Sequence, residues 1–326
     1  MSPQVRRLAW PDHARAMCMA LVVLFHTPPR HAIWDFAVLF NIGVPLFFFF
    51  SGLLFDADRH GRFLPFLRHR CRQLLVPYLM FTAVFYVLWL LVGRRLDESG
   101  AAWWEPLWQT VAGYPDLVIA PFWFVTCLFT MQIIHWLLHH FLRHPWRVVV
   151  ASVVLWAVVG VMPDVWQWNV RRAFVYIPLY AVGNALRPIL LAEQPKRLCH
   201  PLLATTLAVI AIGGLYMSGL IDAMWPSRQV AAASSLLLIP AAVALPQWTA
   251  SRWGTQRVAT VIAANGITYL ALQNYVIGVF KILIDMEWWY RIPVAIAVLA
   301  VIYPIAVLIE RHLPWMLGRG PLFEHS

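Results

Sequence analysis

The chain has 326 residues, of which 61% are hydrophobic and 12% are charged, and its mean hydropathy is +0.67. A soluble domain carries about twice that share of charged residues, so the composition excludes an ordinary soluble protein and favours membrane helices of about 20 residues each. The net charge of +10 comes mostly from arginines in short loops, which suits contact with membrane lipids and argues against nucleic acid as a partner.

Apolar stretches separated by polar breaks predict an all-α, polytopic integral membrane protein with about ten transmembrane helices. The predicted spans are residues 10–28, 34–55, 73–92, 119–141, 147–162, 171–191, 201–219, 229–247, 259–284 and 292–311. We expect residues 1–326 to form a single transmembrane domain with no appended soluble domain.

The first predicted span carries two charged residues, Asp12 and Arg15, and no small-residue cleavage site follows it. We therefore expect it to stay in the protein as a helix and not to be removed as a signal peptide. Lysine and arginine are concentrated in loops, such as residues 56–72, that share a side with the N-terminus if the spans number ten. This bias predicts that both termini lie in the cytoplasm and that Arg291 belongs to the smaller set on the outer side.

Asp12, Arg15 and His26 lie on one face of the first predicted helix. The eleven residues from Arg15 to His26 correspond to about three full turns and a separation of roughly 16 Å. Ionisable residues inside a bilayer are costly and usually mark a function, and an imidazole can take up and return a proton near neutral pH. Spacing alone leaves a second interpretation open, in which Asp12 and Arg15 form an interfacial salt bridge and His26 caps the helix end.

The segment from Asp56 to Arg72, expected to be a cytoplasmic loop, contains Arg68, Arg70 and Arg72. Arg68 and Arg72 would share one face of a helix, and guanidinium groups suit the phosphates of a ligand such as coenzyme A. Attraction to anionic lipid would explain the same arginines without any ligand.

Three further polar or aromatic residues lie within predicted spans. Trp123 opens the fourth span and fits an aromatic belt at the membrane surface. Gln273 and Asn274 fall in the middle of the ninth span, where each needs a hydrogen-bonding partner from another helix or from a polar ligand.

The four cysteines have no paired spacing and no neighbouring histidine pattern, so we expect no metal site. We interpret them as buried small hydrophobic residues, at Cys18, Cys71, Cys127 and Cys199.

In combination, these segments resemble the membrane acyltransferase-3 family, whose members O-acylate bacterial surface carbohydrates. The resemblance starts with Asp12-x-x-Arg15 and the spacing from Arg15 to His26. It continues, as quoted from the sequence, through Gly43-Val-Pro-Leu-Phe-Phe-Phe-Phe-Ser51-Gly52, Arg68-x-x-x-Arg72, Leu74-Leu-Val-Pro77-Tyr78, Pro121-Phe-Trp123-Phe, Tyr176-Ile-Pro-Leu-Tyr180-Ala-Val-Gly183 and Asn265-Gly-Ile-Thr-Tyr-Leu-Ala-Leu-Gln273. The last motif often closes with histidine in the family, and here it closes with Gln273.

The resemblance implies a multi-pass enzyme of the bacterial inner membrane that moves an acetyl or other short acyl group from cytoplasmic acetyl-CoA to a carbohydrate hydroxyl. His26 would be the general base, with Arg15 and Asp12 in the catalytic set. Acetyl-CoA would be held by the arginines Arg68, Arg70 and Arg72. The carbohydrate acceptor, a polysaccharide or lipid-linked glycan, would be contacted by Trp123, Gln273 and Asn274.

A different class of function fits the same charges. A transporter or flippase for a lipid-linked glycan or anion would use Asp12, Arg15 and His26 as a proton relay or substrate site. Against this alternative, the sequence shows no pair of Gly- or Pro-broken helices in matching halves, which is the usual sign of a transport site.

Overall fold

The computed structural model describes residues 8–28, 43–56, 61–96, 100–162, 167–192, 206, 227–285 and 287–320. All regular elements in these ranges are helices, and no strand occurs among them. The all-α prediction is therefore confirmed. Of the predicted spans, residues 201–219 (apart from residue 206) and the first part of 34–55 lie outside the described residues.

Within the part of the chain that the structure describes, five helical stretches are long and apolar enough to cross a membrane. They are Phe63–Gly93, Asp116–Leu142, Gln167–Leu190, Gly266–Leu283 and Arg291–His312. Each overlaps a span expected from the sequence, which confirms a polytopic membrane protein. The full number of ten spans and the orientation of the termini stay predictions.

The contacts divide the chain into two compact units. Unit 1 comprises Met1–Phe55, Pro178–Tyr269 and Gln273–Tyr303, and unit 2 comprises Asp56–Ile177, Leu270–Leu272 and Pro304–Ser326. Each unit is described by itself.

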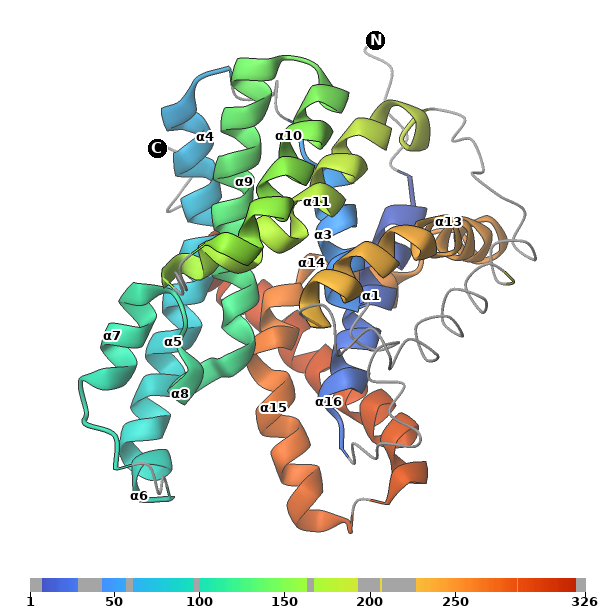
Figure 1. The fold of residues 1–326 in the computed structure, drawn as a ribbon. Coiled ribbons are helices and arrows are strands. Elements are labelled where there is room, and N and C mark those ends of the chain that lie inside the picture. The colour runs from blue at the N-terminus through green and yellow to red at the C-terminus, as the bar shows by residue number, and fades with distance from the viewer. Residues whose placement is uncertain are drawn as a thin grey trace. The chain divides into compact units, whose positions relative to one another are not determined.

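Unit 1 is built on α1, a helix of 17 residues that starts with a proline in its first turn, where a missing N–H costs nothing. Its elements are α1 (Trp10–His26), α3 (Gly43–Leu53), the second part of α11 (Val170–Leu190), α13 (Ser227–Trp253), α14 (Arg257–Ala264), most of α15 (Gly266–Leu283), η7 (Trp288–Tyr290) and the first part of α16 (Arg291–His312). Helix α1 packs against α3, α13 and α14, and Figure 1 shows it among them. His13 ties the start of α1 to the end of α13, because its ring nitrogens lie 3.0 Å from Thr249 Oγ1 and 3.0 Å from Gly254 O.

Helices α3 and α11 cross in direct backbone contact. A Cβ at Gly52 would overlap the carbonyl of Tyr180, and a Cβ at Gly183 would overlap the carbonyl of Phe49. Asn184 Nδ2 donates across this crossing to Phe55 O at 2.8 Å. The two glycine-containing motifs of the sequence therefore meet, and their glycines permit the close approach that membrane helices use for association.

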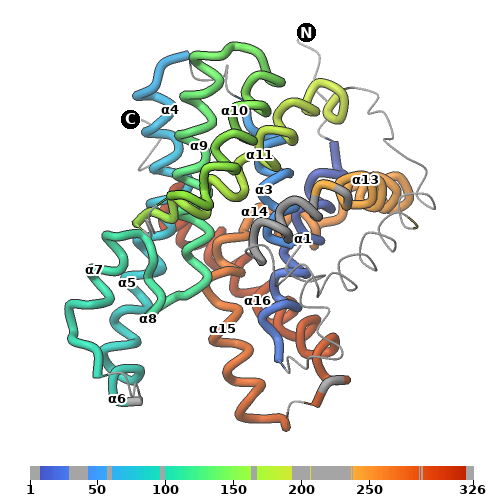
Figure 2. The backbone as a smooth tube through the Cα atoms, in the orientation of Figure 1, coloured from blue at the N-terminus to red at the C-terminus, as the bar shows by residue number. Residues whose placement is uncertain are grey.

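Unit 2 contains the remaining elements. They are α4 (Phe63–Arg70), the π-helical segment η1 (Cys71–Leu75), α5 (Val76–Leu88), the π-helical η2 (Trp89–Gly93), α6 (Arg94–Leu96), α7 (Glu105–Ala112), α8 (Asp116–Ile119), η3 (Ala120–Phe122), α9 (Trp123–Leu142), α10 (Pro145–Val158), η4 (Val159–Val161), η5 (Gln167–Asn169), the first part of α11, Leu270–Leu272 of α15, the second part of α16 and η8 (Pro314–Leu317). Figure 2 shows the chain turning back beyond α6 into α7 and α8, which lie beside α5. Stacked Phe66 and Trp136 rings, with centroids 5.6 Å apart, join α4 to α9.

Two expectations about local structure are wrong. Residues 63–72 are helical and continue into α5 without a break, because apolar residues such as Phe66 give the segment a face to bury. The stretch 259–284 is not one helix, since α14 ends and α15 begins at Asn265, whose φ and ψ are −109° and 27°. Hydropathy does not register this break, since apolar residues flank Asn265 on both sides.

Candidate functional site

Asp12, Arg15 and His26 all lie on α1 in unit 1. The helix is continuous from Trp10 to His26, so the sequence-based separation of roughly 16 Å between Arg15 and His26 along its axis applies directly. One helix therefore carries all three residues of the predicted catalytic set.

His26 is half-buried in the last turn of α1. Its Nδ1 lies 2.8 Å from the carbonyl oxygen of Val22. A carbonyl oxygen only accepts, so in the neutral ring Nδ1 carries the proton and Nε2 carries the lone pair. The neighbouring Phe25 packs edge-on against the imidazole, with ring centroids 5.3 Å apart. This hydrogen bond fixes the tautomer in which Nε2 is the basic atom.

The end of α1 is held by side chains as well as by its own backbone. Thr27 Oγ1 donates to Val23 O at 2.9 Å, and Arg291 Nε donates to Leu24 O at 3.3 Å. Arg291 is buried, and a cation at a helix C-terminus is favoured by the helix dipole. From the sequence, Arg291 counted only as an outer loop charge, and no local pattern connects it to His26.

Nearer the start of α1, the surroundings of Asp12 differ from those of Arg15. Asp12 is buried, and its Oδ2 accepts a hydrogen bond from Thr260 Oγ1 of α14 at 3.4 Å. Arg15 is half-buried, with its guanidinium carbon 5.9 Å from the centroid of the Phe47 ring, so the aromatic segment of α3 offsets part of the cost of that charge.

The three arginines expected to hold the donor belong to unit 2 and differ from one another. Arg68 is exposed on α4. Arg70 Nη1 donates to Gln73 Oε1 at 2.7 Å, and its guanidinium lies over the Phe66 ring. Arg72 is half-buried, and its Nε donates to Gly318 O at 2.7 Å.

Arg72 therefore also ties η1 to the segment after η8. Gly318, with φ of +66°, packs so tightly on this residue that a Cβ would overlap the Arg72 carbonyl. Arg68 is the best placed of the three to meet a ligand from solution. The π-helical segment that carries Arg72 is a type of irregularity often found at functional sites.

Trp123 is also in unit 2, at the start of α9. The guanidinium of Arg172 lies 4.6 Å above its ring, and Arg172 Nη1 donates to Asn169 Oδ1 at 3.0 Å. The buried Asn169 in turn donates to Thr126 Oγ1 at 2.8 Å. Trp123 is thus part of a polar cluster and not only of an aromatic belt.

Gln273 and Asn274 are neighbours on α15 but lie in different surroundings. Gln273 is fully buried, whereas Asn274 is exposed, because successive residues of a helix point about 100° apart. Tyr269, one turn before Gln273, is also fully buried. It was missed as a candidate from the sequence, although the i, i+4 spacing of two polar residues in an apolar helix was the available signal.

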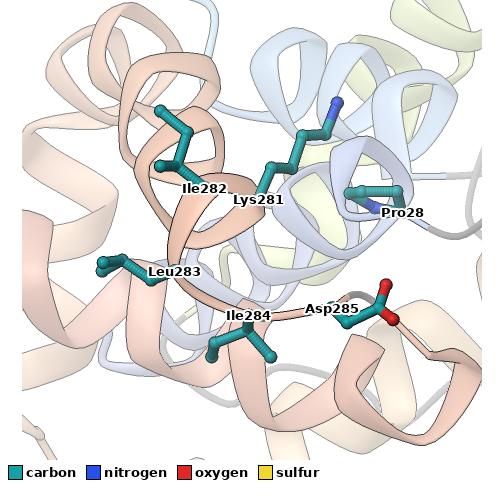
Figure 3. A pocket seen from close by; sticks show the side chains of 6 residues that line it. All are labelled: Pro28, Lys281, Ile282, Leu283, Ile284 and Asp285. Atoms are coloured by element: carbon teal, nitrogen blue, oxygen red, sulfur yellow. The ribbon is translucent and has the colours of Figure 1, made fainter.

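A pocket of about 510 Å³ lies at the far end of α15, lined by Pro28 and residues 281–285. Lys281 and Asp285 lie on the same side as Pro28, and Ile282 and Leu283 point the opposite way (Figure 3). Pro28 follows His26 by two residues, so the pocket is next to the end of α1. Among the described residues, no group of three His, Cys, Asp or Glu side chains is arranged to hold a metal ion.

A comparison with protein families gives a match over most of the chain. The family model described as an acyltransferase domain, acyltransferase family 3, covers residues 8–311. Neither the curated proteins nor the solved structures give a match to this chain. The family match contains every residue of the predicted site, in both units.

Proposed function

Because the chain belongs to the membrane acyltransferase-3 family, we propose that this acyltransferase moves an acetyl or other short acyl group from cytoplasmic acyl-CoA to a carbohydrate hydroxyl. The acceptor is a polysaccharide or lipid-linked glycan on the outer side of the bacterial inner membrane. The observation that carries the proposal is the hydrogen bond from His26 Nδ1 to Val22 O, which gives the basic nitrogen needed to activate a hydroxyl.

His26 acts as the general base. Its Nε2 takes the proton of the acceptor hydroxyl as the oxygen attacks the thioester carbonyl, and the tetrahedral intermediate collapses with loss of the CoA thiolate. The imidazolium returns its proton to that thiolate, so the products are the ester and free CoA. Proton transfer of this kind accelerates a reaction by about 10²–10⁴-fold.

The negative charge that develops on the thioester oxygen needs a donor near His26. Arg15 lies roughly 16 Å from His26 along α1. At that distance Arg15 suits a contact with the incoming acyl donor better than a contact with the reacting carbonyl. Arg291 is the better candidate for that end of the helix, because its guanidinium reaches Leu24 O, two residues before His26.

Acyl-CoA is held through its phosphates by Arg68, Arg70 and Arg72. The exposed Arg68 makes the first contact, and Arg72 is preorganised by its bond to Gly318 O. Guanidinium forks match phosphate oxygens geometrically, which a lysine ammonium does not.

The acceptor enters from the outer side. The pocket beside Pro28 supports this, because the ammonium of Lys281 and the carboxylate of Asp285 lie on its side of the helix end and both hydrogen-bond to sugar hydroxyls readily. Trp123, Gln273 and Asn274 are the further acceptor contacts indicated by the sequence. Asn274 is exposed on α15, which leaves its amide accessible.

The test uses the purified full-length protein in proteoliposomes with acetyl-CoA labelled in the acetyl group and a glycan acceptor. We expect label in the glycan and release of an equal amount of CoA thiol. Movement of a glycan or anion across the bilayer without thiol release would contradict the acyltransferase and support a transporter.

A further inference from the structure

The end of α15 that lines the pocket beside Pro28 has an apolar outer surface. Val279, Ile282 and Leu283 lie in its last turns, with exposed fractions of 55%, 86% and 72%. They belong to the stretch Gly266–Leu283, which is long and apolar enough to cross a membrane. Exposed apolar side chains on such a helix face lipid chains. The pocket therefore lies at the edge of the hydrocarbon layer.

Aromatic residues mark the same boundary. Trp289 and Tyr290 follow the pocket residues in η7, and both are exposed. Their ring centroids lie 6.0 Å apart. Exposed tryptophan and tyrosine rings at the end of a membrane helix lie at the level of the lipid headgroups. A ligand in the pocket thus meets the headgroup layer and not open water.

Two opposite charges line the pocket in a defined order. Lys281 lies in the last turn of α15, whereas Asp285 follows the helix end at Ile284, whose backbone is extended. Lys281 is therefore the nearer of the two to the hydrocarbon layer. Both side chains are exposed and lie on the side of Pro28 (Figure 3). Within the described part of the chain, neither charge forms an ion pair.

This order matches one class of acceptor. A neutral sugar is bound by hydrogen-bonding groups and needs no cation, whereas a phosphate is bound by cations, including the point charge of lysine. A molecule with a lipid chain, a phosphate and a sugar in that sequence would keep its chain in the membrane. Its phosphate would then lie at Lys281, and its sugar hydroxyls would donate to the carboxylate of Asp285.

We propose that the acceptor is a glycan joined through a phosphate to a lipid, with the phosphate bound by Lys281 and the adjoining sugar by Asp285. This rests on the proposed acyltransferase function, and it narrows the two acceptor classes given there to the lipid-linked one. Pro28 follows His26 by two residues and forms part of the pocket wall. A sugar held in the pocket is therefore next to the proposed base.

A lysine at the end of a membrane helix also extends its ammonium to the interface where no ligand is bound. Such an anchor needs no pocket beside it. Here Lys281 lines a pocket of about 510 Å³, which is within the size range of small-molecule sites. The pocket and the unpaired carboxylate of Asp285 therefore favour a ligand over an anchor.

The first test measures binding alone, with the purified full-length protein in lipid nanodiscs. Farnesyl diphosphate, a lipid phosphate without a sugar, is compared with inorganic diphosphate, which has no lipid chain. We expect farnesyl diphosphate to bind about 10-fold more tightly or better, because only its chain gains from apolar surroundings. Lys281→Gln should weaken this binding about 10-fold by loss of a charge-assisted contact, and Lys281→Arg should retain it.

Arg257→Gln is the matched control. Arg257 is exposed at the start of α14, so this variant also removes one positive charge from unit 1. Its affinity for farnesyl diphosphate should equal that of the wild type. Comparison of the variants in identical nanodiscs corrects for farnesyl diphosphate that enters the bilayer without contacting the protein.

The second test measures transfer of labelled acetyl groups to lipid-linked glycans and to the same glycans released from their lipid by mild acid. The wild type should show a KM about 10-fold lower for the lipid-linked form, and Lys281→Gln should remove this difference. Asp285→Asn should raise the KM for both forms, because its contact is with the sugar.

Equal binding of farnesyl diphosphate by the wild type and Lys281→Gln would overturn the proposal and leave Lys281 as an interfacial anchor. Equal use of lipid-linked and released glycans would overturn it in favour of a free polysaccharide. Binding of farnesyl diphosphate that depends on Lys281, without acetyl transfer to either form of glycan, would instead contradict the proposed function. The two failures are therefore distinguishable.

Discussion

His26 Nδ1 lies 2.8 Å from the carbonyl oxygen of Val22, one helical turn earlier on α1. A backbone carbonyl of the same helix thus fixes the tautomer of His26, whereas in many catalytic histidines a carboxylate does so. Protonation of Nε2 would leave the hydrogen bond from Nδ1 to Val22 O in place. It would remove the lone pair that takes up the proton of the carbohydrate hydroxyl.

This geometry predicts how the rate depends on pH. The base must be unprotonated, so kcat/KM should be low in acid, where the imidazole carries a second proton, and rise with pH. The measurement is a pH profile of acetyl transfer at saturating acetyl-CoA. A profile that is flat across that range, in a protein shown to stay folded, would contradict the role of His26 as base.

The crossing of α3 and α11 predicts which glycines the fold requires. Gly52→Ala and Gly183→Ala would each place a Cβ on a backbone carbonyl, and neither backbone has room to move within the crossing. We expect both variants to be strongly destabilised, by about 2 kcal/mol or more, and to accumulate poorly in the membrane.

Gly278→Ala is the control for these substitutions. Gly278 lies inside α15, and a Cβ added there would have no atom within 4 Å, so alanine should raise stability by about 0.5–1 kcal/mol. Thermal unfolding of the three purified variants decides the point. Equal stability of Gly52→Ala and Gly278→Ala would show that the crossing tolerates a methyl group after all.

The arginines on α4 and η1 should separate into two roles. Arg68→Ala should weaken CoA binding and leave the melting temperature unchanged, because Arg68 is exposed. Arg72→Ala should lower both, because it also loses the bond to Gly318 O, and hydrogen bonds to charged groups contribute roughly 1.5–3 kcal/mol. Binding isotherms and thermal unfolding of each variant check this, and a stable Arg72→Ala protein with normal CoA affinity would refute it.

Sidedness can be tested with single cysteines after the native cysteines are replaced. Gly61→Cys and Trp103→Cys both lie at exposed positions, before α4 and before α7. With both termini in the cytoplasm, an impermeant thiol reagent should reach the cysteine at position 61 from the cytoplasmic side and the cysteine at position 103 from the outer side. Labelling of both positions from one side would exclude transfer across the membrane.

Hydropathy was sufficient to predict the class of fold and several spans, because a membrane helix is recognisable from the apolar composition of its own residues. It missed the helix over Phe63–Arg70 and the break at Asn265, since both depend on what the segment packs against. The partners of the site residues were equally hidden. Thr260 and Asp12, or Gly318 and Arg72, are almost 250 residues apart in sequence, and no local pattern encodes such a pair.

The site itself was predicted unevenly for the same reason. Asp12, Arg15 and His26 share a helix face by simple periodicity, so their alignment on α1 could be foreseen. The role of Val22 in orienting His26 requires a helical backbone carbonyl at the correct distance, and the contribution of Arg291 requires that the start of α16 lie near the end of α1. Both are properties of the folded chain.

The most direct test of His26 as the catalytic base compares acetyl transfer by the wild type, His26→Ala and His13→Ala. His13 lies on the same helix and bonds to Thr249 and Gly254, so its variant controls for the loss of an imidazole from α1. Per folded molecule, we predict that His26→Ala loses about 10²–10⁴-fold in rate and still binds CoA, while His13→Ala transfers at a rate near that of the wild type. Transfer by folded His26→Ala at the wild-type rate would contradict the assignment of His26 as the base.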